Sequence, residues 1–265
     1  MMAKNCLDCG AANADAAKFC NECGLKFEEE VTGETVKQTQ PVSIAEKLNA
    51  KMEAFAAQRS QAKADILFVL DCTGSMQGEI DAIRDAIVSV VEAIEEDGVE
   101  SRVGLLEFRD RLYGEEHRVL TFDGEVFTKD AKSFQAQVGK LKAGGGGDRP
   151  ESSLDALLYA TQQPFEPEAK KVIVLITDAP PHIPDREVQS VDEVLNAFHQ
   201  AGIHQFYPVM HTQDEESKVY LRLFTGRKGL AFELGKGEDF RARAEHFKRT
   251  LISLQKTISQ ATMGA

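Results

Sequence analysis

Two unbroken apolar runs stand out along the chain, residues 66–70 and 172–176, and each is followed within two residues by an aspartate, Asp71 or Asp178. Apolar runs of this length are typical of strands that are buried on both faces of a parallel sheet. Other segments, such as residues 77–96, repeat their apolar positions at helical spacing. The alternation of strands and helices predicts an α/β fold with a doubly wound, mostly parallel central sheet and helices on both faces, as in Rossmann-like folds.

The remaining elements of this domain follow from the same patterns. Strands are predicted at residues 102–108, 117–122, 204–210 and 229–234, and helices at 129–141, 152–162, 188–201, 215–224 and from about 239 to near the end of the chain. Pro208 lacks a backbone hydrogen-bond donor, which favours an irregular or flanking position for the strand that contains it.

By composition the chain divides into three parts. Residues 1–27 contain two Cys-x-x-Cys-Gly repeats, residues 28–62 form an acidic linker followed by a helix, and residues 63–262 hold the α/β domain. The helix of the middle part is predicted to begin at a capping box, Ser43-Ile44-Ala45-Glu46. Its thin apolar stripe is compatible either with packing on the main domain or with a stalk.

Four of the five cysteines form two pairs, Cys6 with Cys9 and Cys20 with Cys23. Each pair makes a tight turn that can point two thiolates at one metal, and two such turns complete the four-thiolate site typical of structural Zn²⁺. So short a segment has too little apolar surface to fold alone, so the metal would supply most of its folding free energy. Residues 18–24 resemble the second knuckle of short zinc ribbons. A redox dithiol or a disulfide pair is the alternative.

Charge and composition narrow the possible partners and location. The formal net charge of -12 and the pI of about 5.1 argue against nucleic acid or an anionic membrane as the main partner. No apolar run reaches the ~20 residues that a membrane-spanning helix needs, and the first residues lack the apolar core of a secretory signal. Paired cysteines of this kind favour a reducing compartment, so we expect a cytoplasmic protein.

Oxygen-bearing side chains follow the two apolar strands. Because parallel strands end at the same edge of a sheet, these side chains should face one crevice. A run of four glycines, residues 144–147, can bring a further aspartate over the same edge. Carboxylates and hydroxyls suit Mg²⁺, Mn²⁺ or Ca²⁺, and a cation would relieve the repulsion between the carboxylates. The predicted ligands are Asp71, Thr73, Ser75, Asp148 and Asp178.

These motifs resemble those of a known family. Asp71-Cys72-Thr73-Gly74-Ser75 is similar to the metal-ion-dependent adhesion site (MIDAS) of von Willebrand factor A (vWA) domains, Asp-x-Ser/Thr-x-Ser. Residues 145–151, Gly-Gly-Gly-Asp-Arg-Pro-Glu, and residues 176–182 resemble the second and third loops of a vWA subfamily that includes the domain beside alpha-type kinases. The resemblance covers about residues 63–262.

Membership in this family implies a Mg²⁺ held directly by Thr73 and Ser75, with Asp71 and Asp178 acting largely through bound waters. It also implies a coordination position left open for an acidic side chain of a partner protein. The chain would then be a non-catalytic protein–protein interaction module, with the zinc ribbon as a second interaction or tethering element. Adhesion members offer a threonine in the second loop, whereas this chain has Asp148, whose charge should hold the cation better but make it less receptive to an acidic ligand.

An enzyme is the competing hypothesis. An apolar strand followed by Asp-x-Thr-Gly-Ser also resembles the aspartyl-phosphate motif of Mg²⁺-dependent haloacid dehalogenase-like phosphatases, with Asp71 as the nucleophile. Those enzymes usually insert a flap before the first helix, whereas a helix is predicted to begin here at Gly78. They also need a lysine before the second acidic loop, and Lys170 and Lys171 lie at the wrong end of their strand. A third possibility is that the residues after the first strand merely cap a helix, although one of them would suffice.

Four neighbouring residues are assigned structural roles. Arg149 and Glu151 are expected at the rim of the site or at a helix start, and His182 as a hydrogen-bonding loop residue. Cys72 is expected to be a small buried residue. None of the four is predicted to be a metal ligand.

Overall fold

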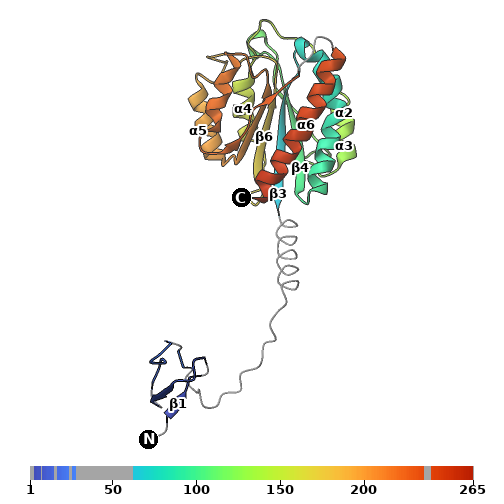
Figure 1. Cartoon of the computed structure of the whole chain (residues 1–265). Helices are drawn as coiled ribbons and strands as arrows, with labels where there is room; N and C mark the ends of the chain where they lie inside the picture. The colour runs from blue at the N-terminus through green and yellow to red at the C-terminus, as the bar shows by residue number, and fades with distance from the viewer. Residues whose placement is uncertain are drawn as a thin grey trace. The chain divides into compact units, whose positions relative to one another are not determined.

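The computed structural model describes residues 3–6, 8–14, 17–23, 26–27, 62–235 and 240–264. The chain forms two compact units, Met1–Ala50 and Lys51–Ala265, which we describe separately (Figure 1). The linker and the capped helix predicted between residues 28 and 61 lie outside the described residues.

The smaller unit contains an antiparallel pair of strands, β1 (Ala3–Asn5) and β2 (Ala12–Ala14). One further bridge joins Phe19 and Lys26. Cys6 lies directly after β1, so the first Cys-x-x-Cys turn connects the two strands. Two strands of three residues cannot bury a core of ordinary size, which agrees with a fold that depends on its cysteines.

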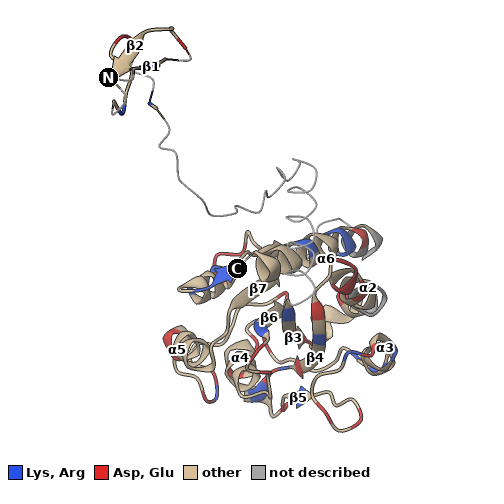
Figure 2. Ribbon diagram, turned by 90° about the horizontal axis from the view of Figure 1, so that it is seen from below, with Lys and Arg blue, Asp and Glu red and all other residues tan. Residues whose placement is uncertain are grey.

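The larger unit is built on one sheet, which has seven strands in the described residues, in the order β5-β4-β3-β6-β7-β8, with β9 also pairing with β7 (Figures 1 and 2). The strands are β3 (Lys63–Asp71), β4 (Glu100–Phe108), β5 (Arg118–Val119), β6 (Lys170–Ile176), β7 (Gln205–Met210), β8 (Lys228–Gly229) and β9 (Phe232–Glu233). Every pairing is parallel except that of β4 with β5. The predicted α/β fold is therefore confirmed.

Helices cover both faces of the sheet (Figure 2). They are α2 (Gln77–Glu96), α3 (Ala131–Val138), α4 (Ser153–Thr161), α5 (Val191–Ala201) and α6 (Phe240–Met263), with 3₁₀ helices η1 (Gly74–Met76), η2 (Arg111–Tyr113) and η3 (Ser217–Phe224). Helices α2, α3 and α6 pack on one face and α4, α5 and η3 on the other. Among the described residues, no helix combines the length and the apolarity that crossing a bilayer would require.

The central strand explains why its sequence is apolar without interruption. Ile66, Phe68 and Leu70 of β3 belong to the core under α2, α3 and α6. Leu67 and Val69 point to the opposite core, under α4, α5 and η3. Successive side chains of a strand face opposite sides, so a strand between two helical layers needs an apolar residue at every position.

The short strands at the two edges differ from the prediction. The strand expected at residues 117–122 has only two paired residues, because the chain turns back at Asp123 and Gly124, both with positive φ, and Phe122 pairs with Glu125. The strand expected at 229–234 is divided into β8 and β9, and the helix expected at 215–224 is a 3₁₀ helix.

Pro208 does not place β7 at the flank of the sheet, because β7 pairs with β6 on one side and with β8 and β9 on the other. The carbonyl oxygens of His204 and Met210 accept hydrogen bonds from Lys228 and Leu234, on the side of β8 and β9. Residue 208 lies at the same alternation, so its backbone faces that side too. There the partner strand is interrupted between Gly229 and Phe232. A missing donor therefore costs no sheet hydrogen bond at this position.

Candidate metal centres

The first site lies at the edge of the sheet where β3 and β6 end. The two strands are paired in register up to Leu70 and Ile176, so Asp71 and Thr177 emerge side by side. The Thr177 hydroxyl donates a hydrogen bond of 2.6 Å to Oδ2 of Asp71. The loops that follow two strands about 100 residues apart in sequence therefore meet at this edge, as expected for parallel strands.

Asp71 is fully buried and organises the loop that follows it. Its Oδ1 accepts hydrogen bonds from the backbone N–H of Thr73 at 2.9 Å and from the Thr73 hydroxyl at 2.6 Å. Burial raises the pKa of Asp71 to about 6, although these hydrogen bonds act in the opposite direction. Both carboxylate oxygens are thus occupied in orienting hydroxyl groups.

Thr73, Ser75 and Asp178 continue this chain of oxygen atoms towards solvent. The hydroxyls of Thr73 and Ser75 are 3.2 Å apart, and the Ser75 hydroxyl donates to Oδ1 of Asp178 at 3.1 Å. Thr73 is buried, Asp178 is half-buried and Ser75 is exposed. Four of the five predicted ligands therefore lie together, and the outer end of the group is open to a ligand.

The glycine loop packs directly against these residues. The backbone N–H of Gly74 donates to the carbonyl oxygen of Gly145 at 3.1 Å. Gly146 has a φ of +83°, and a Cβ atom there would lie 2.9 Å from Oε1 of Glu151 and 3.3 Å from Cβ of Thr73. Only glycine combines this backbone conformation with so close an approach.

Asp148, the fifth predicted ligand, lies in a different group. Its side chain is 52% exposed, and its Oδ1 is 3.6 Å from Nε2 of His182. His182 also contacts Oδ2 of Asp110 through Nε2, at 3.2 Å. The glycine loop approaches Thr73 with its backbone but directs the Asp148 carboxylate towards Asp110 and His182.

Glu151 has the position beside Thr73 that was expected for Asp148. The residue is 3% exposed, and its Oε2 is buried without a hydrogen-bond partner among the described residues. Burial, followed by the charges of Asp71, Asp110 and Asp178, raises the pKa of Glu151 to about 9. A buried carboxylate oxygen without a donor, near other carboxylates, is what a site for a divalent cation provides.

The second group consists of Asp110, Asp148 and His182, whose nearest ligand atoms all lie within 4.8 Å of one another. Asp110 follows β4 and is fully buried. Neither Asp110 nor His182 is predicted from the sequence as a ligand. The sequence does contain a signal for Asp110, because this residue comes two positions after a third buried parallel strand, β4, which ends at the same edge of the sheet.

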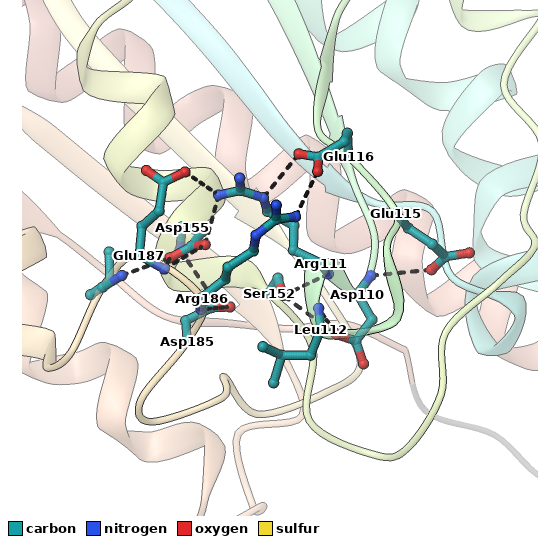
Figure 3. A network of polar contacts seen from close by, with 11 residues as sticks. Asp110, Arg111, Leu112, Glu115, Glu116, Ser152, Asp155, Asp185, Arg186 and Glu187 are labelled. Carbon is teal, nitrogen blue, oxygen red and sulfur yellow. Dashed lines mark hydrogen bonds and ion pairs between the residues drawn. The ribbon is translucent and has the colours of Figure 1, made fainter.

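A polar network holds the loop after β4 against the start of α4 (Figure 3). Ser152 accepts a hydrogen bond from the backbone N–H of Arg111 at 2.9 Å, and Asp110 accepts one from Leu112 at 2.9 Å. The guanidinium of Arg111 pairs with the buried Asp155 at 2.8 Å and with Glu187 at 2.7 Å. These contacts fix Asp110 relative to the second and third loops.

The four cysteines of the smaller unit form a separate candidate centre. Their sulfur atoms lie within 4.8 Å of one another, with Cys6 and Cys23 at 3.5 Å and Cys9 and Cys20 at 3.5 Å. Backbone N–H groups of Cys23 and Glu22 lower the pKa of the Cys20 thiol to about 6. The arrangement fits a metal that binds thiolates.

Comparison with known proteins gives the family. The family profile described as "von Willebrand factor A domain" matches residues 65–204. The chain belongs to the von Willebrand factor A domain family. The vWA domain identifies the larger unit as an interaction or adhesion type of domain, and the matched range does not include the cysteine centre.

One sequence relative and one solved structure of similar fold are both longer than this chain. "Alpha-protein kinase vwkA" of Dictyostelium discoideum is 31% identical over 140 residues, which are 52% of this chain and 22% of that protein. The pilus adhesin SpaC from Lactobacillus rhamnosus GG, solved in an open conformation, has a TM-score of 0.54 and 16% identity, covering 75% of this chain and 30% of that one. The chain thus spans less than a third of either protein, and the adhesin shows the fold alone.

Proposed function

We propose that this vWA domain is a non-catalytic module that binds a partner protein through a divalent cation, Mg²⁺, at a MIDAS. The observation that carries the proposal is the chain of oxygen contacts from Asp71 through Thr73 and Ser75 to Asp178. It joins the first and third loops around hydroxyl and carboxylate oxygens, which are the ligands that Mg²⁺ prefers.

The residues of this site have different roles in the proposal. The hydroxyls of Thr73 and Ser75 face the cation, and Asp71 orients Thr73 through two hydrogen bonds. Asp178 supplies a carboxylate at the exposed end. We assign the second-loop carboxylate to Glu151, because its free oxygen is buried beside the site, whereas Asp148 contacts His182.

The site favours binding over phosphoryl transfer. A nucleophilic Asp71 would have to reach a phosphate, yet it is fully buried and both its oxygens accept short hydrogen bonds. Helix η1 begins at Gly74, three residues after Asp71, and α2 follows it directly, so no flap separates this loop from the helix. These features weigh against the phosphatase hypothesis.

The rim suggests what a partner would present besides an acidic group for the cation. Leu112, Tyr113 and Ile183 are 51%, 60% and 50% exposed. Leu112 and Tyr113 follow Asp110, and Ile183 follows His182, so all three lie on loops of this edge. The partner would therefore offer a carboxylate flanked by apolar side chains, which bury more apolar surface than a charged group alone.

The cysteine centre completes the proposal. Cys6, Cys9, Cys20 and Cys23 would hold a structural Zn²⁺, and the resulting ribbon would tether the protein or bind a second partner. The acidic linker would connect the ribbon to the vWA domain. Because cysteines that bind Zn²⁺ must stay reduced, a reducing compartment such as the cytoplasm suits the protein.

Calorimetric titration with Mg²⁺ tests the MIDAS. Ser75→Ala and Asp178→Ala should each weaken Mg²⁺ binding by about 10-fold or more while leaving the circular dichroism spectrum unchanged. Asp192→Ala, which removes an exposed ion-paired aspartate on α5, is the matched control and should bind Mg²⁺ normally. Unchanged affinity in both site variants would refute the site.

Partner binding needs a second measurement. Crosslinking mass spectrometry of the wild type should identify a protein that is captured in Mg²⁺ but not without it, and Ser75→Ala should lose that protein. A phosphoryl or metal-fluoride adduct on Asp71 would instead support the phosphatase.

A further inference from the structure

We propose that Asp110, Asp148 and His182 form a second divalent-metal site beside the MIDAS, which binds a transition-metal ion such as Mn²⁺ or Zn²⁺ in preference to Mg²⁺. The site is built from three loops, after β4, before α4 and after β6. It goes beyond the proposed MIDAS because it shares no ligand with it.

The distances between the ligand atoms match a coordination shell. Nε2 of His182 is 3.2 Å from Oδ2 of Asp110 and 3.6 Å from Oδ1 of Asp148. Ligands bound to one ion at about 2.0–2.1 Å lie about 2.9 Å apart in an octahedral shell and about 3.3 Å apart in a tetrahedral one. A separation of 3.6 Å is too long for a hydrogen bond, so hydrogen bonding alone does not explain the position of Asp148.

Two of the three ligands are held in place before any ion binds. Oδ1 of Asp110 accepts hydrogen bonds from the backbone N–H of Leu112 at 2.9 Å and from the Ser152 hydroxyl at 3.5 Å (Figure 3). Oδ2 of Asp110 is left to contact His182. The backbone N–H of His182 donates to the carbonyl oxygen of Glu151 at 3.0 Å. Outer contacts that orient ligands in this way are typical of metal sites.

The negative charge at this edge is not neutralised by neighbouring arginines. The three arginines closest in sequence to Asp110 and Asp148 form ion pairs with other carboxylates: Arg109 with Glu107, Arg111 with Asp155 and Glu187, and Arg149 with Asp214 and Glu216. The Glu151 carboxylate, whose Oε2 has no hydrogen-bond partner among the described residues, lies among Asp71 and Asp178 of the MIDAS and Asp110 of the second group. One cation at the MIDAS would leave the second group uncompensated.

The imidazole decides which ion is expected. Mg²⁺ prefers an all-oxygen shell, whereas imidazole suits Zn²⁺, and Mn²⁺ accepts a mixed shell of one imidazole and two carboxylates. One histidine and two carboxylates do not fill the coordination shell of such an ion. Water can occupy the remaining positions, because the Asp148 side of the site is exposed. The competing explanation is a His182–Asp110 hydrogen bond with Asp148 nearby but not involved.

Electron paramagnetic resonance of Mn²⁺ added to the full chain, with Zn²⁺ at the cysteines, counts the bound ions. The wild type should bind two Mn²⁺ ions, and both His182→Ala and Asp148→Asn should bind one. Asp148 is 52% exposed, so its replacement keeps the test valid if His182→Ala fails to fold. His211→Ala is the matched control, because His211 also pairs with a carboxylate, that of Glu233 at 3.4 Å, outside the proposed site. This variant should still bind two Mn²⁺ ions.

Ser75→Ala separates the second site from the MIDAS. This variant should reduce the number of bound Mn²⁺ ions to one. The ion that remains should still broaden the nuclear magnetic resonance signal of the His182 imidazole. If the MIDAS proposal fails and this one holds, the wild type binds one Mn²⁺, which is lost in Asp148→Asn and kept in Ser75→Ala. A count that does not change in either His182→Ala or Asp148→Asn overturns the second site.

Discussion

Replacing Glu151 by glutamine should stabilise the metal-free protein at pH 7 and weaken its binding of Mg²⁺. Burial and the surrounding carboxylates raise the pKa of Glu151 from its ordinary 4.5 to about 9. Between these values the folded protein keeps the proton and the unfolded chain loses it, so the free energy of unfolding falls as pH rises. Glutamine has the same shape and no proton to lose, so it removes this pH-dependent cost.

The magnitude follows from the linkage between protonation and folding. At about 1.4 kcal/mol per pH unit, the difference between pH 4.5 and pH 7 amounts to about 3 kcal/mol if the carboxyl is fully shielded. Because Asp178, one of the carboxylates that act on Glu151, is only half-buried, water reaches this edge and screens part of the effect, so we expect a gain of about 1–2 kcal/mol. At pH 4.5 the wild type and the variant should be equally stable.

Urea unfolding of the vWA domain in buffer without divalent cations, at pH 5 and pH 8, measures the effect. Glu168→Gln, at an exposed site, is the control and should follow the wild type. Addition of Mg²⁺ should raise the midpoint of the wild type more than that of Glu151→Gln, because a ligand stabilises the state that binds it. A variant that is less stable than the wild type at pH 8, or a stability difference that does not depend on pH, would refute the reasoning.

Three further predictions concern the cysteine centre and the polar network. A strong chelator should remove amide-exchange protection from residues 3–23 and leave that of residues 63–235 unchanged, because the ribbon depends on its metal; equal protection with and without chelator would contradict this. Arg111→Met should lower the free energy of unfolding, measured in urea, by about 3 kcal/mol, since it leaves the buried carboxylate of Asp155 without a cation. A change below about 1 kcal/mol would show that backbone N–H groups alone stabilise this carboxylate. Burial, with the charge of Arg111 nearby, lowers the pKa of His117 to about 4. The free energy of unfolding should therefore fall by up to about 3 kcal/mol as pH drops from 6.5 to 4, and His117→Phe should reduce this pH dependence in acid unfolding.

The part of the site that follows strand ends could be predicted from the sequence. Two wholly apolar strands imply a parallel sheet, and parallel strands share an edge, so Asp71 and Asp178 could be placed together without a structure. The hydroxyls of Thr73 and Ser75 come with Asp71 because they are two and four residues away on the same turn. The same rule applied to β4 would have found Asp110.

The second loop could not be read in this way, because its side-chain directions depend on contacts that are distant in sequence. The backbone of Glu151 pairs with the third loop, donating to Pro180 and accepting from His182. This pairing turns Glu151 inwards and leaves Asp148 outside, three residues earlier in the same motif. Sequence spacing gives the residues that reach the edge, but the pairing of two loops decides which of them faces Thr73.

The charge at this edge bears on whether an acidic partner can bind. Five carboxylates gather there, those of Asp71, Asp110, Asp148, Glu151 and Asp178. With all of them ionised, Mg²⁺ at the MIDAS would leave an excess of about three negative charges, which repels a carboxylate ligand, and a second divalent cation would reduce the excess to about one.

Occupancy of the second site should therefore tighten the binding of an acidic partner at the first. Once a partner captured in Mg²⁺ is known, its affinity for the wild type should rise on addition of Mn²⁺, and the rise should be smaller in Asp148→Asn. Because Mn²⁺ can also replace Mg²⁺ at the MIDAS of both proteins, only the difference between the two reports on the second site. An equal gain in both would mean that the two centres bind their ions independently of the partner.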